Sequence, residues 1–378
     1  MLEVTTLDAC PICQSPRMDA LPPPARWIGR DVFAPVAGKL GLARCRDCDL
    51  VFVNPRPAPD LLARFYTSPG YVCHAADGSE LAARKALARL GELGRLAPPR
   101  PGARLLDYGC GGGALLRVAR EAGWNAIGYD IGGAALASCR RQGLPVTSDL
   151  DSLSGQRFDA IVLIHVLEHL SDPCAVLERL RGLLAPGGRL CIEVPNARSL
   201  RATLAAPELA SRLGLDERYR AFPIHLDYYC KRTLPRLLER AGFSVDLVTT
   251  LGLGLDELFV RPEIAPPDVE PGQPAGVPPA PAAPAAPRIS GPRQRAKSLL
   301  KKVFFERGLG ENLMVIARPR PEARPSLPPR VTSRDAGADA GAGPGTGGIR
   351  PTVIDVDLSL NAVADYACCA DVPLRDNA

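Results

Sequence analysis

The amino-acid sequence predicts an α/β fold, in which helices cover both faces of a parallel sheet and a small metal-binding module precedes them. Three observations lead to this prediction. From residue 103 onward, apolar runs of strand length alternate with amphipathic segments of helix length. A glycine-rich loop separates the first of these runs from the first helix. Two C-x-x-C pairs lie ahead of residue 50.

The two cysteine pairs define the first module, residues 1–58. Two C-x-x-C knuckles well apart in the chain supply four thiolates, which is the ligand set of a structural zinc ion. A module this small has little core, so a bound metal would contribute much of its stability. A redox pair or an iron–sulfur centre is the alternative, but the strand–helix setting of a thioredoxin-like redox pair is absent. We therefore predict a closed zinc site formed by Cys10, Cys13, Cys45 and Cys48.

Residues 59–100 are predicted to be a helical connector. A short helix within 59–71 ends at a Ser-Pro-Gly turn. A second helix, 79–97, has leucines at helical spacing, which predicts an amphipathic helix that packs against the following domain. These leucines are Leu81, Leu87, Leu90, Leu93 and Leu96.

Strands and helices then alternate through the domain that we place at 101–318. The expected strands are 103–109, 125–130, 144–148, 158–164, 189–195, 244–250 and 311–319. The expected helices are 113–122, 133–142, 174–184 and 231–243. Such alternation is typical of parallel strands joined by crossover helices.

Two segments have the composition of chain that cannot bury a core. Residues 262–295 are rich in Pro and Ala and read as a disordered or polyproline insertion ahead of the last strand. A basic segment, 293–302, follows. Residues 319–378 are rich in Arg, Pro, Gly and Ala, and we expect a disordered tail.

The glycine loop contains the first candidate ligand-binding residues. Gly109, Gly111 and Gly113 lie between a strand and a helix, where the backbone can approach a ligand closely. Glycine spacing alone also fits a dinucleotide site. Asp107, just before the loop, would repel a pyrophosphate but suits a ligand with an amine or sulfonium cation. Asp130 ends the next strand, at the offset where a carboxylate binds the ribose of an adenosine. Together they favour S-adenosylmethionine over NAD.

Asp149 and Leu150 follow the short third strand, where a side chain would reach the adenine amino group. The alternative for Asp149 is a loop carboxylate that faces water.

Four motifs in order resemble those of class I S-adenosylmethionine-dependent methyltransferases: DYGCGGG, GYDIGGAAL, FDAIVLIHVLEHLSDP and LAPGGRLCIEVPN. The nearest group is similar to the ubiquinone-biosynthesis O-methyltransferases. The resemblance covers about residues 101–260 and the last strand near 312–318. It implies a Rossmann-like sheet of seven strands whose last strand is antiparallel, with the Pro-rich insertion as a departure. By position it implies that the methionine part is held by Asp107, Gly109, Gly111 and Gly113, the ribose by Asp130, and the adenine by Asp149 and Leu150.

The cysteine module is similar to the zinc-ribbon leaders of many bacterial methyltransferases of sugar and secondary-metabolite pathways. It also resembles the leaders of some ribosomal-RNA methyltransferases.

Histidines supply the candidate catalytic groups. His165, Glu168 and His169 follow the fourth strand. The spacing H-x-x-E-H also matches inverted zinc peptidases, but there the ligands lie on a helix, whereas His165 here lies at the tip of a strand. In the related methyltransferases this turn packs beside the methionine end, so we assign His165 to the cofactor and to catalysis, with a structural role as the alternative. His225 precedes the helix 231–243, and we predict that it is the general base for the acceptor. Its alternative is a helix cap or a lid residue.

Charge and hydrophobicity narrow the classes of partner. The 46 basic and 41 acidic residues give a net charge of +5, which does not demand a nucleic acid. No apolar run is long enough to span a membrane, and the first residues lack a signal peptide, so we expect a cytoplasmic protein. We predict a methyltransferase for a small-molecule acceptor, such as a sugar or a secondary-metabolite intermediate. An RNA methyltransferase that uses the module and the basic segment, and a module that binds without chemistry, are the alternatives; the acceptor and the oligomeric state are left open.

Overall fold

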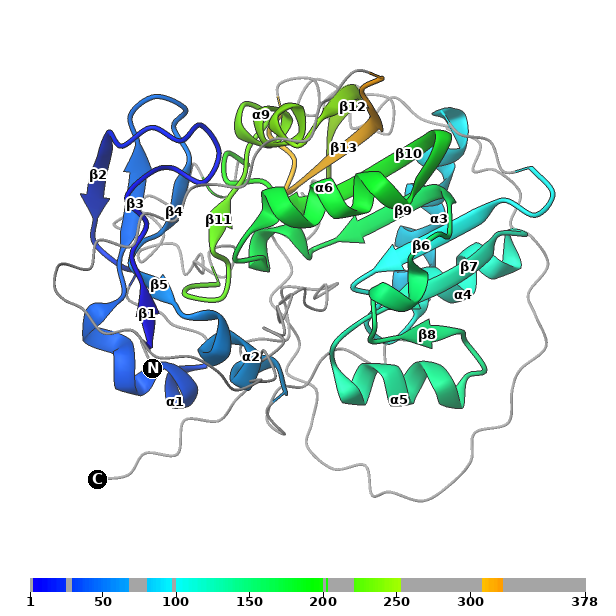
Figure 1. Cartoon of the computed structure of the whole chain (residues 1–378), viewed down its shortest axis with the longest axis horizontal. Helices are drawn as coiled ribbons and strands as arrows, with labels where there is room; N and C mark the ends of the chain where they lie inside the picture. The colour runs from blue at the N-terminus through cyan, green and yellow to red at the C-terminus, as the bar shows by residue number, and fades with distance from the viewer. Residues whose placement is uncertain are drawn as a thin grey trace, which may run out of the picture.

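The computed structural model describes residues 3–24, 29–67, 80–96, 100–199, 202, 221–252 and 308–321. In Figure 1 the first 67 residues form a unit on one side of the molecule, and the larger sheet lies on the other. The Pro-rich insertion and the basic segment lie outside the described residues, as does almost all of the predicted tail.

The cysteine module is built from short strands. Its elements are β1 (Val4–Thr5), β2 (Met18–Leu21), α1 (Arg30–Phe33), a 3-10 helix (Ala34–Lys39), β3 (Leu42–Cys45), β4 (Val51–Val53) and β5 (Arg56–Pro57). Strands β2, β3 and β4 form an antiparallel sheet, and β1 pairs with β5. The helix α2 (Pro59–Thr67) follows and packs against α1 through a contact of the Phe33 and Phe65 rings.

The fourth strand of the module's sheet comes from much later in the chain. β11 (Asp227–Tyr228) pairs antiparallel with β4, with Asp227 opposite Phe52. The pairing is visible in Figure 1, where β11 runs beside β4. The larger domain therefore completes the sheet of the module, which the sequence did not predict.

The larger sheet has seven strands in the order β12-β13-β10-β9-β6-β7-β8. They are β6 (Arg104–Tyr108), β7 (Asn125–Tyr129), β8 (Val146–Thr147), β9 (Phe158–Ile164), β10 (Leu184–Pro195), β12 (Phe243–Leu251) and β13 (Asn312–Pro319). β13 runs antiparallel to both of its neighbours, and the pairs from β10 to β8 are all parallel. This confirms the predicted seven-stranded sheet with an antiparallel last strand.

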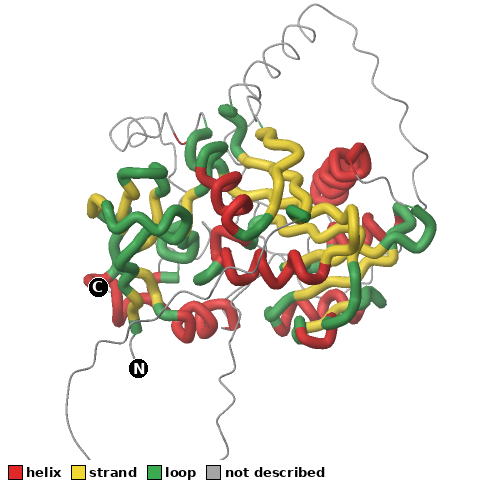
Figure 2. Tube along the Cα trace, turned by 45° about the horizontal axis from the view of Figure 1, so that its top comes forward, coloured by secondary structure: helices red, strands yellow, loops and turns green. Residues whose placement is uncertain are grey.

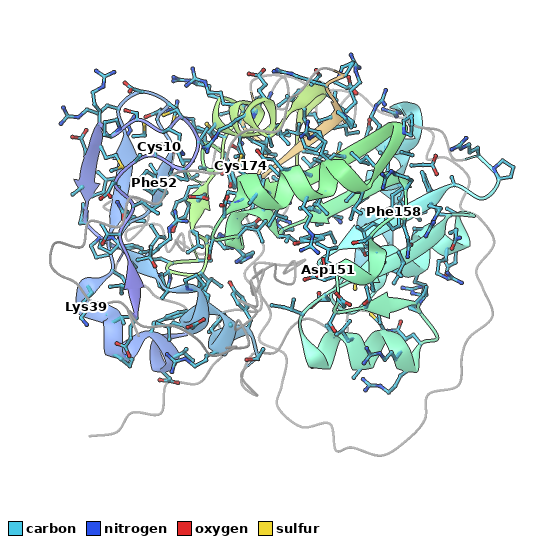
Figure 3. The ribbon with its side chains drawn as sticks, viewed as in Figure 1. Cys10, Lys39, Phe52, Asp151, Phe158 and Cys174 are labelled. Atoms are coloured by element: carbon cyan, nitrogen blue, oxygen red, sulfur yellow. The ribbon has the colours of Figure 1, made fainter. Side chains whose placement is uncertain are left out.

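Helices cover both faces of this sheet, as predicted (Figure 2). One face packs against α3 (Glu80–Leu96), α4 (Ala114–Glu121) and Cys139 of α5 (Gly133–Arg141). The other face packs against α6 (Pro173–Leu183) and α9 (Thr233–Arg240). The apolar cluster on this second face continues into the cysteine module, because Cys10, Phe52 and Cys174 all belong to it (Figure 3).

Two helices can be compared with their predictions: α3 in its buried face and α6 in its first residue. Leu87 of α3 is 55% exposed, so its predicted place on the buried face is wrong. Leu90 and Leu93 are buried with Ala86, and Arg89 takes a buried position beside them. α6 starts at Pro173 because Asp172 caps it, accepting a hydrogen bond from the backbone N–H of Ala175 at 3.0 Å.

Candidate active site

The glycine loop lies at the end of β6, and α4 begins directly behind it. Gly109, Gly111 and Gly113 have φ values of 81°, 51° and 83°. At Gly113 an added Cβ would lie 2.5 Å from the Leu144 side chain, so only glycine fits this position. No side chain caps α4, which leaves the N–H groups of its first turn for a ligand.

Asp107 and Asp130 end adjacent strands beside this loop. Asp107 is buried, and its Oδ2 has no hydrogen-bond partner among the described residues. Burial and the charge of Asp130 raise the pKa of Asp107 to about 7, although Arg89 acts in the opposite direction. A buried carboxylate oxygen without a donor suits the amine of S-adenosylmethionine.

Asp130 also shapes the loop. Its carboxylate accepts hydrogen bonds from the N–H of Gly111 at 2.9 Å and of Gly132 at 2.7 Å. Burial raises its pKa to about 6, against the effect of these backbone donors. A carboxylate has about four lone-pair sites, so it can still accept from a ribose. Asp130 therefore fits the predicted ribose contact and holds the glycine loop as well.

The two adenine-side residues differ in burial. Leu150 is 4% exposed and belongs to the core, whereas Asp149 is exposed. The Asp149 carboxylate accepts from the N–H of Asp151 at 2.9 Å, so it also stabilises its own turn. Their contact with adenine remains a prediction. Taken together, the cradle of the loop and the two carboxylates fit S-adenosylmethionine.

His165 lies just after β9, with φ of 53°, and is buried within a chain of alternating charges. Its Nδ1 lies 3.4 Å from Glu168, and its Nε2 lies 3.6 Å from Glu193 on β10. Burial alone lowers the pKa of His165, but the two carboxylates outweigh burial and raise it to about 9. An imidazolium at neutral pH is a poor proton acceptor, so this geometry favours the structural alternative for His165 over a role as base.

Arg89 of α3 completes this charge chain, and the sequence reasoning missed it. Its guanidinium donates two hydrogen bonds to Glu193, at 2.6 and 2.7 Å. Burial by itself would raise the pKa of Glu193, but Arg89 and His165 hold it well below its usual range. Two features of the sequence could have revealed this pair: Arg89 lies among the apolar residues of its helix, and Glu193 lies within the apolar strand 189–195.

His169, His225 and Glu168 form a buried cluster beside this chain. Nδ1 of His169 lies 3.0 Å from the carbonyl oxygen of Ile224 and 3.0 Å from the hydroxyl of Tyr66. A carbonyl only accepts, so we assign the proton to Nδ1 and the lone pair to Nε2. Burial lowers the pKa of His169, which keeps the ring neutral.

The cluster presents hydrogen-bond acceptors that lack donors. Within the described part of the chain, Nε2 of His169 and both carboxylate oxygens of Glu168 have no hydrogen bond of good geometry, although Oε1 of Glu168 forms the ion pair with His165 described above. Nε2 lies 4.0 Å from Oε1 of Glu168. The ligand atoms of Glu168, His169 and His225 all lie within 4.8 Å of one another. This arrangement suits a ligand that donates hydrogen bonds, and the donor set is also one that divalent cations accept.

The four cysteines of the module converge as the spacing predicted. Their sulfur atoms all lie within 4.8 Å of one another. Cys10 and Cys48 are 3.5 Å apart at Sγ, and Cys13 and Cys45 are 3.4 Å apart. Tetrahedral zinc with bonds of about 2.3 Å places its sulfurs about 3.8 Å apart. The thiols therefore fit zinc, and the metal itself remains a proposal.

Known proteins match the part of the chain that carries the cofactor loop. Residues 79–248 match a family model described as "Methyltransferase domain". Residues 79–248 are therefore a methyltransferase domain, and its strand order and curated relatives indicate the class I S-adenosylmethionine-dependent type. This family assignment agrees with the strand order and with the fit of the loop to the cofactor.

Two curated relatives of this methyltransferase are named "Ubiquinone biosynthesis O-methyltransferase". The one from Chelativorans sp. (strain BNC1) is 31% identical over 171 residues, and the one from Xylella fastidiosa (strain 9a5c) is 35% identical over 165 residues. These matches cover 43% and 40% of this chain and 65% of each relative. A solved S-adenosylmethionine-dependent methyltransferase from Archaeoglobus fulgidus is 21% identical, with a TM-score of 0.40 over 62% of this chain and 93% of its own.

Proposed function

We propose that this methyltransferase moves the methyl group of S-adenosylmethionine to a hydroxyl oxygen of a small molecule. The observation that carries the proposal is the cluster of Glu168, His169 and His225, in which Glu168 and His169 offer buried acceptors to an incoming hydroxyl donor. The curated relatives are named O-methyltransferases, which supports oxygen as the acceptor atom. The similarity of the cysteine module to zinc-ribbon leaders favours a sugar or secondary-metabolite acceptor.

The protein's own groups divide the work between two regions. The bound cofactor supplies an electrophilic methyl group on a sulfonium sulfur. Asp107 would pair with the cofactor's amine and Asp130 with its ribose, while the glycine loop lets the backbone approach. His225 would take the proton of the reacting hydroxyl, and neutral His169 would orient the acceptor by accepting at Nε2 from a neighbouring hydroxyl of the same molecule.

The described residues give the RNA alternative limited support. Three exposed arginines of the module pair with neighbouring aspartates: Arg17 with Asp47, Arg44 with Asp49 and Arg46 with Asp19. Asp49 is shared with Arg198 and Arg232, so only a small excess of positive charge there faces a phosphate backbone. Among the described residues, none of the helices combines the length and the hydrophobicity needed to cross a membrane.

The test uses the full chain and radiolabelled S-adenosylmethionine with a panel of hydroxylated sugars, sugar nucleotides and phenols. Calorimetry with S-adenosylhomocysteine first establishes cofactor binding. We expect label on an oxygen of at least one acceptor and none on RNA. A protein that binds neither form of the cofactor, or that methylates only nitrogen, carbon or RNA, would contradict the proposal.

A further inference from the structure

Arg56 places a buried guanidinium at the junction between the cysteine module and the sheet. Its side chain is 3% exposed, and it follows β4 in the module. The guanidinium donates to the carbonyl of Val53 at 3.1 Å, to the carbonyl of Ser171 at 3.3 Å and to the carboxylate of Asp227 at 3.1 Å. One side chain thus joins three separate segments.

Two of these segments carry the histidine cluster. Ser171 ends the turn that contains Glu168 and His169, and Asp227 lies two residues after His225. The same two segments meet directly, because the N–H of Leu226 donates to the carbonyl of Glu168 at 2.6 Å. The guanidinium of Arg56 therefore bridges the two segments at whose junction the histidines converge.

The module and the adjoining helix α2 supply further contacts to the same junction. The N–H of Val53 donates to the carbonyl of Leu226 at 2.8 Å, which extends the pairing of β4 with β11. The Tyr66 hydroxyl, on α2, lies 3.0 Å from Nδ1 of His169. Within the larger domain, Tyr229 donates to the second carboxylate oxygen of Asp227 at 3.3 Å. Groups of β4 and α2 thus hold His169 itself and the segment that bears His225.

A buried ion pair of this kind is better suited to fixing geometry than to adding stability. Removing two charges from water is costly, and the attraction between them roughly offsets this cost. Arginine fits the position because its planar fork can donate to a carboxylate and two carbonyls at once. A lysine would retain the charge but not this set of three donors.

We propose that Arg56 is a positioning residue for the acceptor half of the active site. It sets the distance between the turn that bears His169 and the segment that bears His225, and it makes the cysteine module part of the methyl-transfer machinery. This inference rests on the proposed function. The hydrogen bonds of Arg56 go to Val53, Ser171 and Asp227 and to none of the cofactor residues at β6, β7 and β8, so we expect cofactor affinity to depend on it little.

The test compares Arg56→Met and Arg56→Lys with a matched control, Arg46→Met. Arg46 is an exposed arginine of the same module and pairs with Asp19. We expect Arg56→Met to lower kcat by about 10- to 100-fold, as misplacement of catalytic groups by about 1 Å does, while the Kd for the cofactor changes less than about twofold. Arg56→Lys should recover part of kcat, millimolar guanidinium should restore turnover to Arg56→Ala, and Arg46→Met should match the wild type.

A second measurement does not depend on turnover. Ring proton shifts of His169 and His225, observed by NMR on histidine-labelled protein, report how the two rings face each other. They should change in Arg56→Met and not in Arg46→Met. If Arg56→Met does not fold, Asp227→Asn, which keeps the size of its partner, takes its place in both measurements.

The outcomes separate this inference from the proposed function. If the wild type methylates no acceptor, the proposed function fails, and the NMR comparison alone decides the role of Arg56. Unchanged histidine shifts, an unchanged kcat, or a loss of kcat matched by an equal loss of cofactor affinity would each overturn the positioning role.

Discussion

His169 and His225 meet edge to face, with ring centroids 4.7 Å apart and ring planes at 80°. The two rings come from segments far apart in the chain: His169 from the turn after β9, and His225 from the segment before β11. Tyr66 of α2 packs edge to face against His169 as well, with ring centroids 6.0 Å apart. The proposed acceptor half of the site is therefore shared between the larger domain and the N-terminal elements.

His225 gives the first prediction. His225→Ala should cut turnover by about 10²–10⁴, because a positioned general base contributes about this much. The affinity for the cofactor should stay near that of the wild type, because His225 lies with His169 rather than with Asp107 and Asp130. Steady-state kinetics and calorimetry on the same preparation check both statements.

The matched control for His225 is the other ring of the pair, His169→Gln. Glutamine keeps a hydrogen-bonding group but no basic nitrogen, so if His169 only orients the acceptor, kcat should fall less than in His225→Ala. A His225 variant that loses cofactor affinity in step with turnover would make His225 a lid residue. Near-normal turnover would remove it from the mechanism.

Asp107 gives a pH dependence. Its pKa in the ligand-free protein is raised to about 7, so at pH 6 most molecules hold a protonated carboxyl. Only the carboxylate pairs with the cofactor's ammonium, so binding must release this proton. Affinity should therefore fall up to about tenfold for each pH unit below 7 and level off above it. Calorimetry in two buffers of different ionisation enthalpy measures the released proton directly.

The controls for this dependence are two asparagine variants. Asp107→Asn should bind weakly at every pH and release no proton. Asp149→Asn, an exposed carboxylate on the same edge of the sheet, should keep the pH dependence of the wild type. The idea fails if the wild type binds equally well at pH 5.5 and 7.5.

Much of the fold follows from local patterns in the sequence. The run 158–164 is apolar apart from Asp159, because β9 lies at the middle of the sheet with both faces covered. The cofactor loop was predictable for a similar reason: glycines and carboxylates at the ends of adjacent parallel strands must gather at one edge. The cysteine cluster was predictable from spacing alone, because two C-x-x-C knuckles supply the four thiols of one tetrahedral metal site.

The acceptor half was much harder to predict. Arg56, Asp227 and Tyr66 acquire their roles only when the module docks on the sheet, and no local periodicity records that contact. β11 is two residues long, and it forms because β4 offers an open edge. Arg89 was hidden in a helix whose leucines suggested a different buried face, as the exposed Leu87 shows. Predictions from one sequence fail where a side chain's partner lies far along the chain.

Zinc content is the next prediction. Freshly purified protein should hold about one zinc per chain, as one closed four-cysteine site requires. Cys13→Ser should lose the metal and destabilise the module. Because β4 pairs with β11, it should also lower turnover, while cofactor affinity is kept. Cys174→Ser, a buried thiol of α6 outside the cluster, is the control and should retain the zinc. Elemental analysis that finds no metal would contradict the site.

The buried pair of Arg89 and Glu193 gives a prediction about stability. Glu193→Gln leaves the Arg89 guanidinium buried without its counter-charge, and breaking such a pair costs about 3–5 kcal/mol. For a domain of this size, that lowers the unfolding midpoint by on the order of 10 °C. The double variant Arg89→Met with Glu193→Gln should recover part of the loss, because it removes the orphaned charge. Glu92→Gln, in the exposed pair with Arg95 on the same helix, should cost less than about 1 kcal/mol. Thermal unfolding of the four proteins, followed by circular dichroism, decides the matter: equal midpoints for Glu193→Gln and Glu92→Gln would show that the buried pair does not hold α3 to the sheet.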